Sequence, residues 1–99
     1  MNIIWTLKAL ESYFNVSDYL QEEWNSKVVR EFAEEVEKVI NGIQENPHMF
    51  EASKKQKNIR KGFVTKHNLL YYRIKPRKEE IELLLFWDTR QDLKKLKFK

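Results

Sequence analysis

Positively charged side chains are the residues of this sequence whose types and spacing point most clearly to chemistry. Arg60, Arg73 and Arg90 lie in or next to three different segments that have the pattern of β-strands. A guanidinium group is planar and holds a phosphate or a carboxylate through two parallel hydrogen bonds. If one folded sheet gathers the three arginines, they form an anion-binding site. The alternative is that Arg73 faces solvent beside Lys75 and that Arg90 neutralises a neighbouring aspartate.

The charges divide the chain into two unlike halves. The formal net charge is +4, but residues 1–46 carry a balance of −5 and residues 47–99 a balance of +9. Ten lysines and arginines occur from Lys54 to Lys78 with no carboxylate between them, and aromatic residues are interleaved with them. Such a cluster attracts anions and speeds their arrival. This pattern favours an anionic partner, either a nucleic acid or an acidic protein segment, over a face that only keeps the protein soluble.

Several kinds of chemistry lack the residues that they need. The chain has no cysteine, which excludes disulfides, thiolate metal sites and a cysteine nucleophile. His48 and His67 stand alone in expected loops, without the further ligands of a metal site. There is no Gly-rich phosphate loop and no Gly-x-Ser-x-Gly elbow. Paired carboxylates such as Glu34 and Glu35 fall on a solvated helix face, without the pocket that a general acid–base pair needs. We expect no metal and no cofactor.

Length and composition predict one domain, over residues 1–99. The chain is 41% hydrophobic and 13% aromatic, which is too apolar for a disordered chain. Its longest uninterrupted apolar run, Leu83 to Trp87, is too short to cross a membrane. The first residues lack the basic and long apolar regions of a signal peptide. We therefore expect a soluble cytoplasmic domain with no membrane partner.

The first half of the chain predicts a short strand and two helices. Residues 3–5 favour a strand, and Thr6 caps a helix over residues 7–22. A regular apolar stripe from Val28 to Ile43 predicts a second helix, which ends at Asn46-Pro47 because the residue before proline avoids the helical region. The short connection between the two helices indicates an antiparallel hairpin.

The second half predicts three strands and a last short helix. Residues 59–65 and 69–75 alternate between apolar and polar, and residues 80–87 are nearly all apolar, as in a central strand covered on both faces. The short connections between them indicate consecutive antiparallel hairpins. A helix after Asp88 would run to Leu96. The order β-α-α-β-β-β-α predicts an α+β fold, with the helical hairpin packed on one face of an antiparallel sheet.

Four motifs occur in one order along the chain. They are Trp5-Thr6 followed by Ala9, then Ile59-Arg60, then the tyrosine-rich strand of residues 70–74, and last the strand of residues 83–92 with its Arg-Gln-Asp ending. This ordered set resembles the RelE/ParE superfamily, the toxins of bacterial type II toxin–antitoxin pairs. The resemblance covers essentially the whole chain and implies the same β-α-α-β-β-β fold.

The superfamily has two branches that differ in action. RelE-like members cut mRNA on the ribosome without a metal, whereas ParE-like members bind DNA gyrase. In the cutting branch an arginine stands directly before the Leu-x-Tyr strand, and here that position is Leu69. A tyrosine or histidine near the C-terminus often completes that site, and residues 93–99 contain neither. These departures, the long helical hairpin and the Arg-Gln-Asp ending favour the ParE branch.

The resemblance implies a toxin that acts by binding its target, DNA gyrase, and that a cognate antitoxin neutralises. The antitoxin would lay an acidic, partly disordered segment along the basic sheet or the hairpin groove, in a toxin–antitoxin hetero-oligomer. The residues expected to bind the target or the antitoxin are Arg60, Lys61, Lys66, Tyr71, Arg73, Lys75 and Arg90.

Three alternatives remain open at this point. In a RelE-like ribosome-dependent endoribonuclease, Arg60, Arg73 and Arg90 would surround the scissile phosphate of the mRNA. In a non-toxic nucleic-acid-binding module, Tyr71 or Tyr72 would stack on bases. A decayed toxin would keep only the surface that binds its antitoxin.

Overall fold

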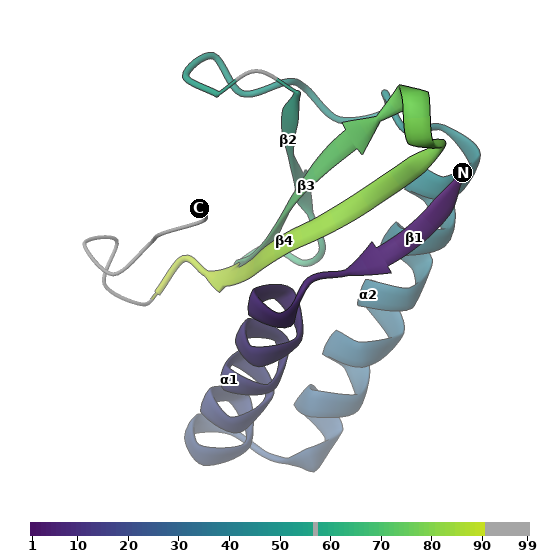
Figure 1. Ribbon diagram of the computed structural model, residues 1–99. Helices are drawn as coiled ribbons and strands as arrows, with labels where there is room; N and C mark the ends of the chain where they lie inside the picture. Colours follow the sequence, from purple (N-terminus) through teal and green to yellow (C-terminus); the bar gives the residue numbers. More distant parts are fainter. Residues whose placement is uncertain (57, 91–99) are drawn as a thin grey trace.

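A computed structural model describes residues 1–56 and 58–90 of the chain (Figure 1). Two helices and four strands follow one another as the sequence predicts. The expected helix up to Leu96 lies outside the described residues. The elements are β1 (Asn2–Trp5), α1 (Leu7–Glu23), α2 (Ser26–Glu45), β2 (Ile59–Phe63), β3 (Asn68–Lys75), a 3₁₀ turn, η1 (Pro76–Lys78), and β4 (Glu80–Asp88).

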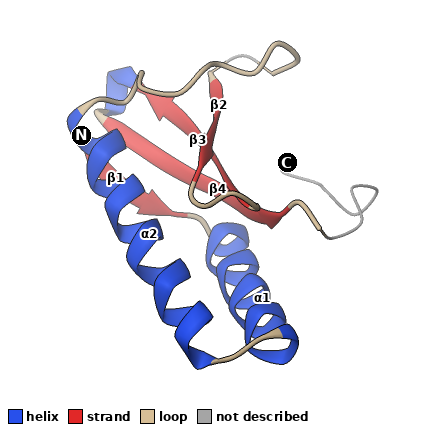
Figure 2. Ribbon diagram, turned by 180° about the vertical axis from the view of Figure 1, so that it is seen from behind, coloured by secondary structure: helices blue, strands red, loops and turns tan. Residues whose placement is uncertain are grey.

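Local hydrogen bonds set the ends of both helices. The Thr6 hydroxyl accepts a hydrogen bond from the Ala9 amide at 3.0 Å, and the Asn25 side chain accepts one from the Val28 amide at 3.1 Å. Each side chain satisfies an amide that has no partner within its helix. α2 ends at Glu45 with Asn46 as its C-cap, directly before Pro47, as predicted. The two helices lie on one face of the sheet, as the view from behind shows (Figure 2).

The sheet is mixed rather than wholly antiparallel, and in this respect the prediction is wrong. The strand order is β1-β4-β3-β2, in which β1 runs parallel to β4 and the other pairs are antiparallel. No tight turn connects β1 to β4, so nothing forces them into a hairpin. β4 is a central strand, as its apolar run predicts.

Both faces of β4 are buried because its side chains divide between two clusters. On the helix face, Leu83 and Phe86 join a core with Tyr72 and with side chains from both helices. On the opposite face, which we call the outer face, Leu84 and Trp87 belong to a second cluster. Tyr72 pairs with Leu83 but Tyr71 pairs with Leu85, so a bulge at Leu84 shifts the alternation. The bulge explains why the neighbouring residues Leu84 and Leu85 both belong to the cluster on the outer face. No helix in the described part of the chain is long and apolar enough to span a membrane.

β1 is too short to pair with all of β4. Hydroxyl groups at the start and in the interior of α1 therefore form hydrogen bonds with the backbone of β4. The Thr6 hydroxyl donates to the Leu83 carbonyl oxygen at 2.7 Å, next to the end of β1. Further along β4, the Ser12 hydroxyl accepts from the Phe86 amide at 2.9 Å and donates to the Ala9 carbonyl oxygen. Ser12 is buried, so this hydroxyl satisfies a strand amide that water does not reach. α1 is thereby fixed to the central strand.

Replacing Ser12 with alanine tests this connection. Ser12→Ala leaves the Phe86 amide without its partner, and we expect the free energy of unfolding to fall by about 1–3 kcal/mol. The matched control is Ser17→Ala, because Ser17 bonds only to the Tyr13 carbonyl oxygen within its own helix. The control should change stability by less than about 0.5 kcal/mol. Urea denaturation compares the two, and equal effects would contradict the role given to Ser12.

Candidate functional site

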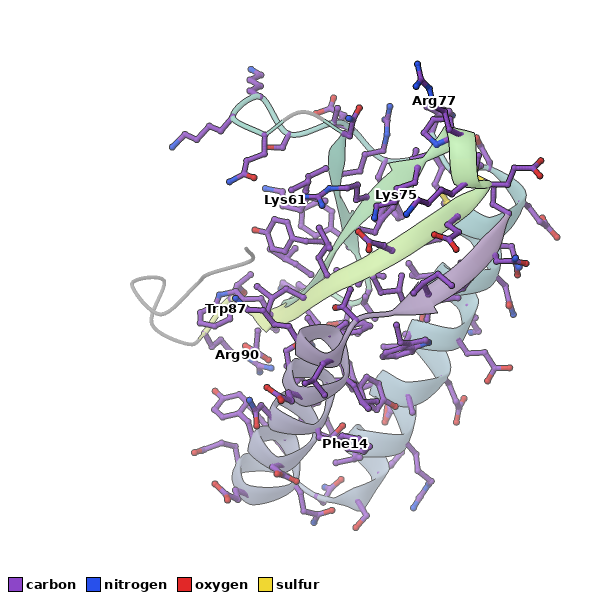
Figure 3. All side chains as sticks on the ribbon, viewed as in Figure 1. Phe14, Lys61, Lys75, Arg77, Trp87 and Arg90 are labelled. Carbon is purple, nitrogen blue, oxygen red and sulfur yellow. The ribbon has the colours of Figure 1, made fainter. Side chains whose placement is uncertain are left out.

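The three arginines expected to form one anion site lie apart. Arg60 pairs with Tyr72 on the helix face, and its guanidinium donates to the Phe50 carbonyl oxygen. Arg73 pairs with Ile59, so it lies on the outer face of the sheet. Arg90 follows the end of β4, beside α1 (Figure 3). The expected gathering does not occur, because strand alternation sends Arg60 and Arg73 to opposite faces.

Arg90 forms a tight ion pair with Asp88, an arrangement that the sequence offered only as the alternative. Its Nε and Nη2 atoms donate to the two carboxylate oxygens at 2.8 and 2.6 Å, and its amide also donates to Asp88 at 2.9 Å. The guanidinium lies over the Trp24 ring, 4.3 Å from its centroid, and near Tyr19. Hydrogen bonding to Asp88 raises the pKa of Arg90 above its usual value. Because Asp88 is completely buried, the main role of Arg90 is to neutralise this carboxylate.

Four of the predicted binding residues share the outer face: Lys61, Tyr71, Arg73 and Lys75. Arg73 and Lys75 both pair with Glu82, at 3.7 and 3.1 Å, which reduces their charge toward an incoming anion. Lys61 lies 6.0 Å from the centre of the Phe63 ring. Burial raises the pKa of the Tyr71 hydroxyl, which stays protonated at neutral pH. Figure 3 shows Lys61 and Lys75 on this face, well away from Arg90.

Lys66 belongs to a different part of the surface. It lies in the turn between β2 and β3 and lines a pocket of about 300 Å³ together with Arg90 and Trp24. The predicted binding residues are therefore distributed over the helix face, the outer face and the α1 end of β4.

Tyr72 is unable to stack on a base, because it is completely buried. Its hydroxyl donates to the Pro47 carbonyl oxygen at 2.7 Å. Burial raises the pKa of this hydroxyl, although the positive charge of Arg60 opposes the effect. Of the two tyrosines expected to stack, Tyr71 is also buried, with 8% of its surface exposed.

An apolar groove lies over the helical hairpin, which the sequence suggested as one of two places for an antitoxin without identifying the residues that line it. This hairpin groove has a volume of about 420 Å³ and lies between α1, α2 and β1. Leu10 and Phe14 remain 42% and 55% exposed beside it. Their spacing of four residues, off the buried stripe of α1, is the signal that was available in the sequence. Its lining includes Trp5, Leu10, Tyr13, Phe14, Ala33 and Ile40.

Within residues 1–56 and 58–90, no three histidine, aspartate or glutamate side chains lie close enough to hold a metal ion. His48 is exposed in the segment after α2, and His67 is half-buried in the turn between β2 and β3.

The comparisons with known proteins give a family from the family model and a fold from the solved structures. The family described as the ParE toxin of the type II toxin–antitoxin system parDE matches residues 3–93. No curated protein sequence matches the chain. The YoeB/ParE toxin from Agrobacterium tumefaciens is similar with a TM-score of 0.64 and 15% identity, over 89% of this chain and 98% of that one. A chain from the chromosomal ParDE TA system of P. aeruginosa is similar with a TM-score of 0.73 and 16% identity, over 89% and 95%.

Removing Arg90 should destabilise the fold rather than only weaken binding. Arg90→Ala leaves the buried Asp88 carboxylate without its partner, and the free energy of unfolding should fall by up to about 3 kcal/mol. This value is the lower end of the range for buried pairs, because the Arg90 side chain is 29% exposed. Arg73→Ala is the control, since its more exposed pair with Glu82 contributes less than about 1 kcal/mol.

Thermal denaturation measures both changes, and the variant that combines Asp88→Asn with Arg90→Ala should recover part of the loss because no buried charge remains. A small effect of Arg90→Ala, equal to that of the control, would show that the pair is not structural.

Proposed function

The chain belongs to the family of ParE toxins of type II toxin–antitoxin systems, and from this premise we propose that it arrests bacterial growth in the cytoplasm by binding DNA gyrase and that a cognate antitoxin neutralises it. The resemblance predicted from the sequence and the α+β class are confirmed. The target and the mode of neutralisation are our proposal.

The separation of the three arginines is the observation that supports binding over RNA cleavage. A metal-independent ribonuclease needs charged groups around one phosphate to stabilise the transition state and to transfer a proton. Arg60 bonds to a carbonyl oxygen on the helix face, Arg73 lies on the outer face, and Arg90 is held by Asp88. Since these side chains do not surround a common point, cleavage by the expected trio is disfavoured.

Growth arrest alone does not distinguish the two targets, so the decisive experiment measures both activities with one preparation. We expect the purified protein to inhibit DNA supercoiling by gyrase and to leave reporter mRNA intact in a translating extract. Cleavage of mRNA within codons, with supercoiling unaffected, would overturn the proposal and favour the ribonuclease.

We place the antitoxin contact in the hairpin groove. A partly disordered segment must bury apolar surface when it folds on its partner, because the burial offsets the entropy that it loses. The groove supplies such surface, with Phe14 and Leu10 exposed along α1. A helix with apolar side chains three, four and seven residues apart fits a groove between two helices. The basic outer face lacks a comparable row of exposed apolar side chains in its described part.

The change Phe14→Glu should weaken the binding of the antitoxin to the hairpin groove. A carboxylate in the groove would be desolvated by the docked helix, so antitoxin affinity should fall by about 30-fold or more. Phe63→Glu is the matched control, because Phe63 is similarly exposed but lies on the outer face. Isothermal titration with the cognate antitoxin compares the two variants. If Phe14→Glu binds the antitoxin as tightly as the control does, the groove is not the docking site.

A further inference from the structure

A second groove lies along the outer edge of the sheet, beside β2. Its volume is about 700 Å³. One wall is the segment of residues 49–56, and the other is formed by side chains of β2 and β3 on the outer face. Phe50 holds the segment against β2, since its ring lies so close to Gly62 that an added Cβ would come within 2.8 Å of the ring. The residues that give the groove its chemistry are Lys54, Lys55, Lys61, Phe63 and Tyr71.

Within the part of the chain that the structure describes, the lysines of this groove are not paired with carboxylates, whereas the cations of β3 on the same face are. Lys54, Lys55 and Lys61 are exposed. In contrast to Arg73 and Lys75, they form no ion pair with any carboxylate of the described residues. Only one carboxylate, that of Glu51, belongs to the described lining of the groove. The groove therefore offers its positive charge to an external anion.

Phe63 supplies a flat apolar surface in the same place. The side chain is 57% exposed at the end of β2 and lies on the outer face with Lys61, two residues earlier. The Lys61 ammonium group is 6.0 Å from the ring centre. An exposed ring in a groove that also holds lysines is an arrangement on which an unpaired base can stack while the lysines contact the phosphates.

The backbone of β2 is already occupied at this edge, which argues against a peptide that binds by adding a strand. Ala52 forms a bridge with Arg60. The Ser53 amide donates to the Ile59 carbonyl oxygen at 2.7 Å, and the Lys61 amide donates to the Glu51 carbonyl oxygen at 3.4 Å. A ligand in this groove must therefore be bound by the protein's side chains, which is how proteins bind single-stranded nucleic acids.

We propose that the groove beside β2 binds a single strand of nucleic acid, with phosphates held by Lys54, Lys55 and Lys61 and one base stacked on the ring of Phe63. Phosphates and base faces are common to DNA and RNA, so both should bind. This site is independent of the hairpin groove and of the toxin's action on gyrase.

The test uses the whole purified protein and fluorescent oligothymidine and oligouridine strands of about twelve nucleotides. Fluorescence anisotropy measures affinity between about 50 and 200 mM salt. Neutralisation of three phosphates predicts a slope of log affinity against log salt of about −2, and each of Lys54→Ala, Lys55→Ala and Lys61→Ala should reduce its magnitude by about 0.7. Lys27→Ala, which removes an exposed charge at the start of α2, should leave the slope unchanged.

Substitutions of Phe63 distinguish base stacking from simple charge attraction. Phe63→Tyr keeps the ring and should retain the affinity, whereas Phe63→Leu should weaken binding about five-fold or more. The site is rejected if neither oligonucleotide binds, if Lys27→Ala acts like the groove lysines, or if Phe63→Leu has no effect. It is also rejected if a duplex of equal length or an acidic peptide of equal charge displaces the strand equally well. Circular dichroism melting curves verify that each variant is folded.

Discussion

The hydrogen-bonding groups of β4 impose the constraint on which the rest of the structure depends. This strand lies inside the sheet with both faces buried, so its backbone groups need partners on both edges. β3 supplies one edge, and β1 supplies only the first part of the other. Beyond β1, hydroxyl groups at the start and in the interior of α1 supply further bonds. The helical hairpin is therefore oriented by polar contacts to the strand as well as by apolar packing, and that orientation leaves its groove exposed.

The fold separates two kinds of recognition. The helical half carries a net negative charge and an apolar groove, and the groove suits a partner that buries hydrophobic surface. The strands and the segment before them carry unpaired lysines beside an exposed ring, which suit an anion with a flat apolar part. Because the grooves involve different elements, one can be occupied without covering the other. The sequence already shows this division in the charges of its two halves, but only the fold shows which cations are unpaired.

The structure is predictable from the sequence where a local interaction decides it. Thr6 and Pro47 act on amides or dihedral angles within a few residues, so the start of α1 and the end of α2 were predictable. The apolar run of β4 was also sufficient to predict a central strand. The site was less predictable, because the face on which Arg60 lies depends on the register between β2 and β3. The role of Arg90 depends on the burial of Asp88, and the exposure of Phe14 depends on how the hairpin crosses the sheet. The register of β2 and the burial of Asp88 are long-range features that spacing does not encode, whereas the spacing of Leu10 and Phe14 along α1 is visible in the sequence.

Residues 51–53 form hydrogen bonds with the outer edge of β2, and this affects how readily copies of the protein aggregate. An open strand edge is a template on which another chain adds its own strand, and this is a common start of aggregation. Here one border of the sheet is covered by the chain itself, and the opposite border, β1, is only four residues long. Newly made molecules therefore offer one another little free backbone on which a strand from another copy could be added.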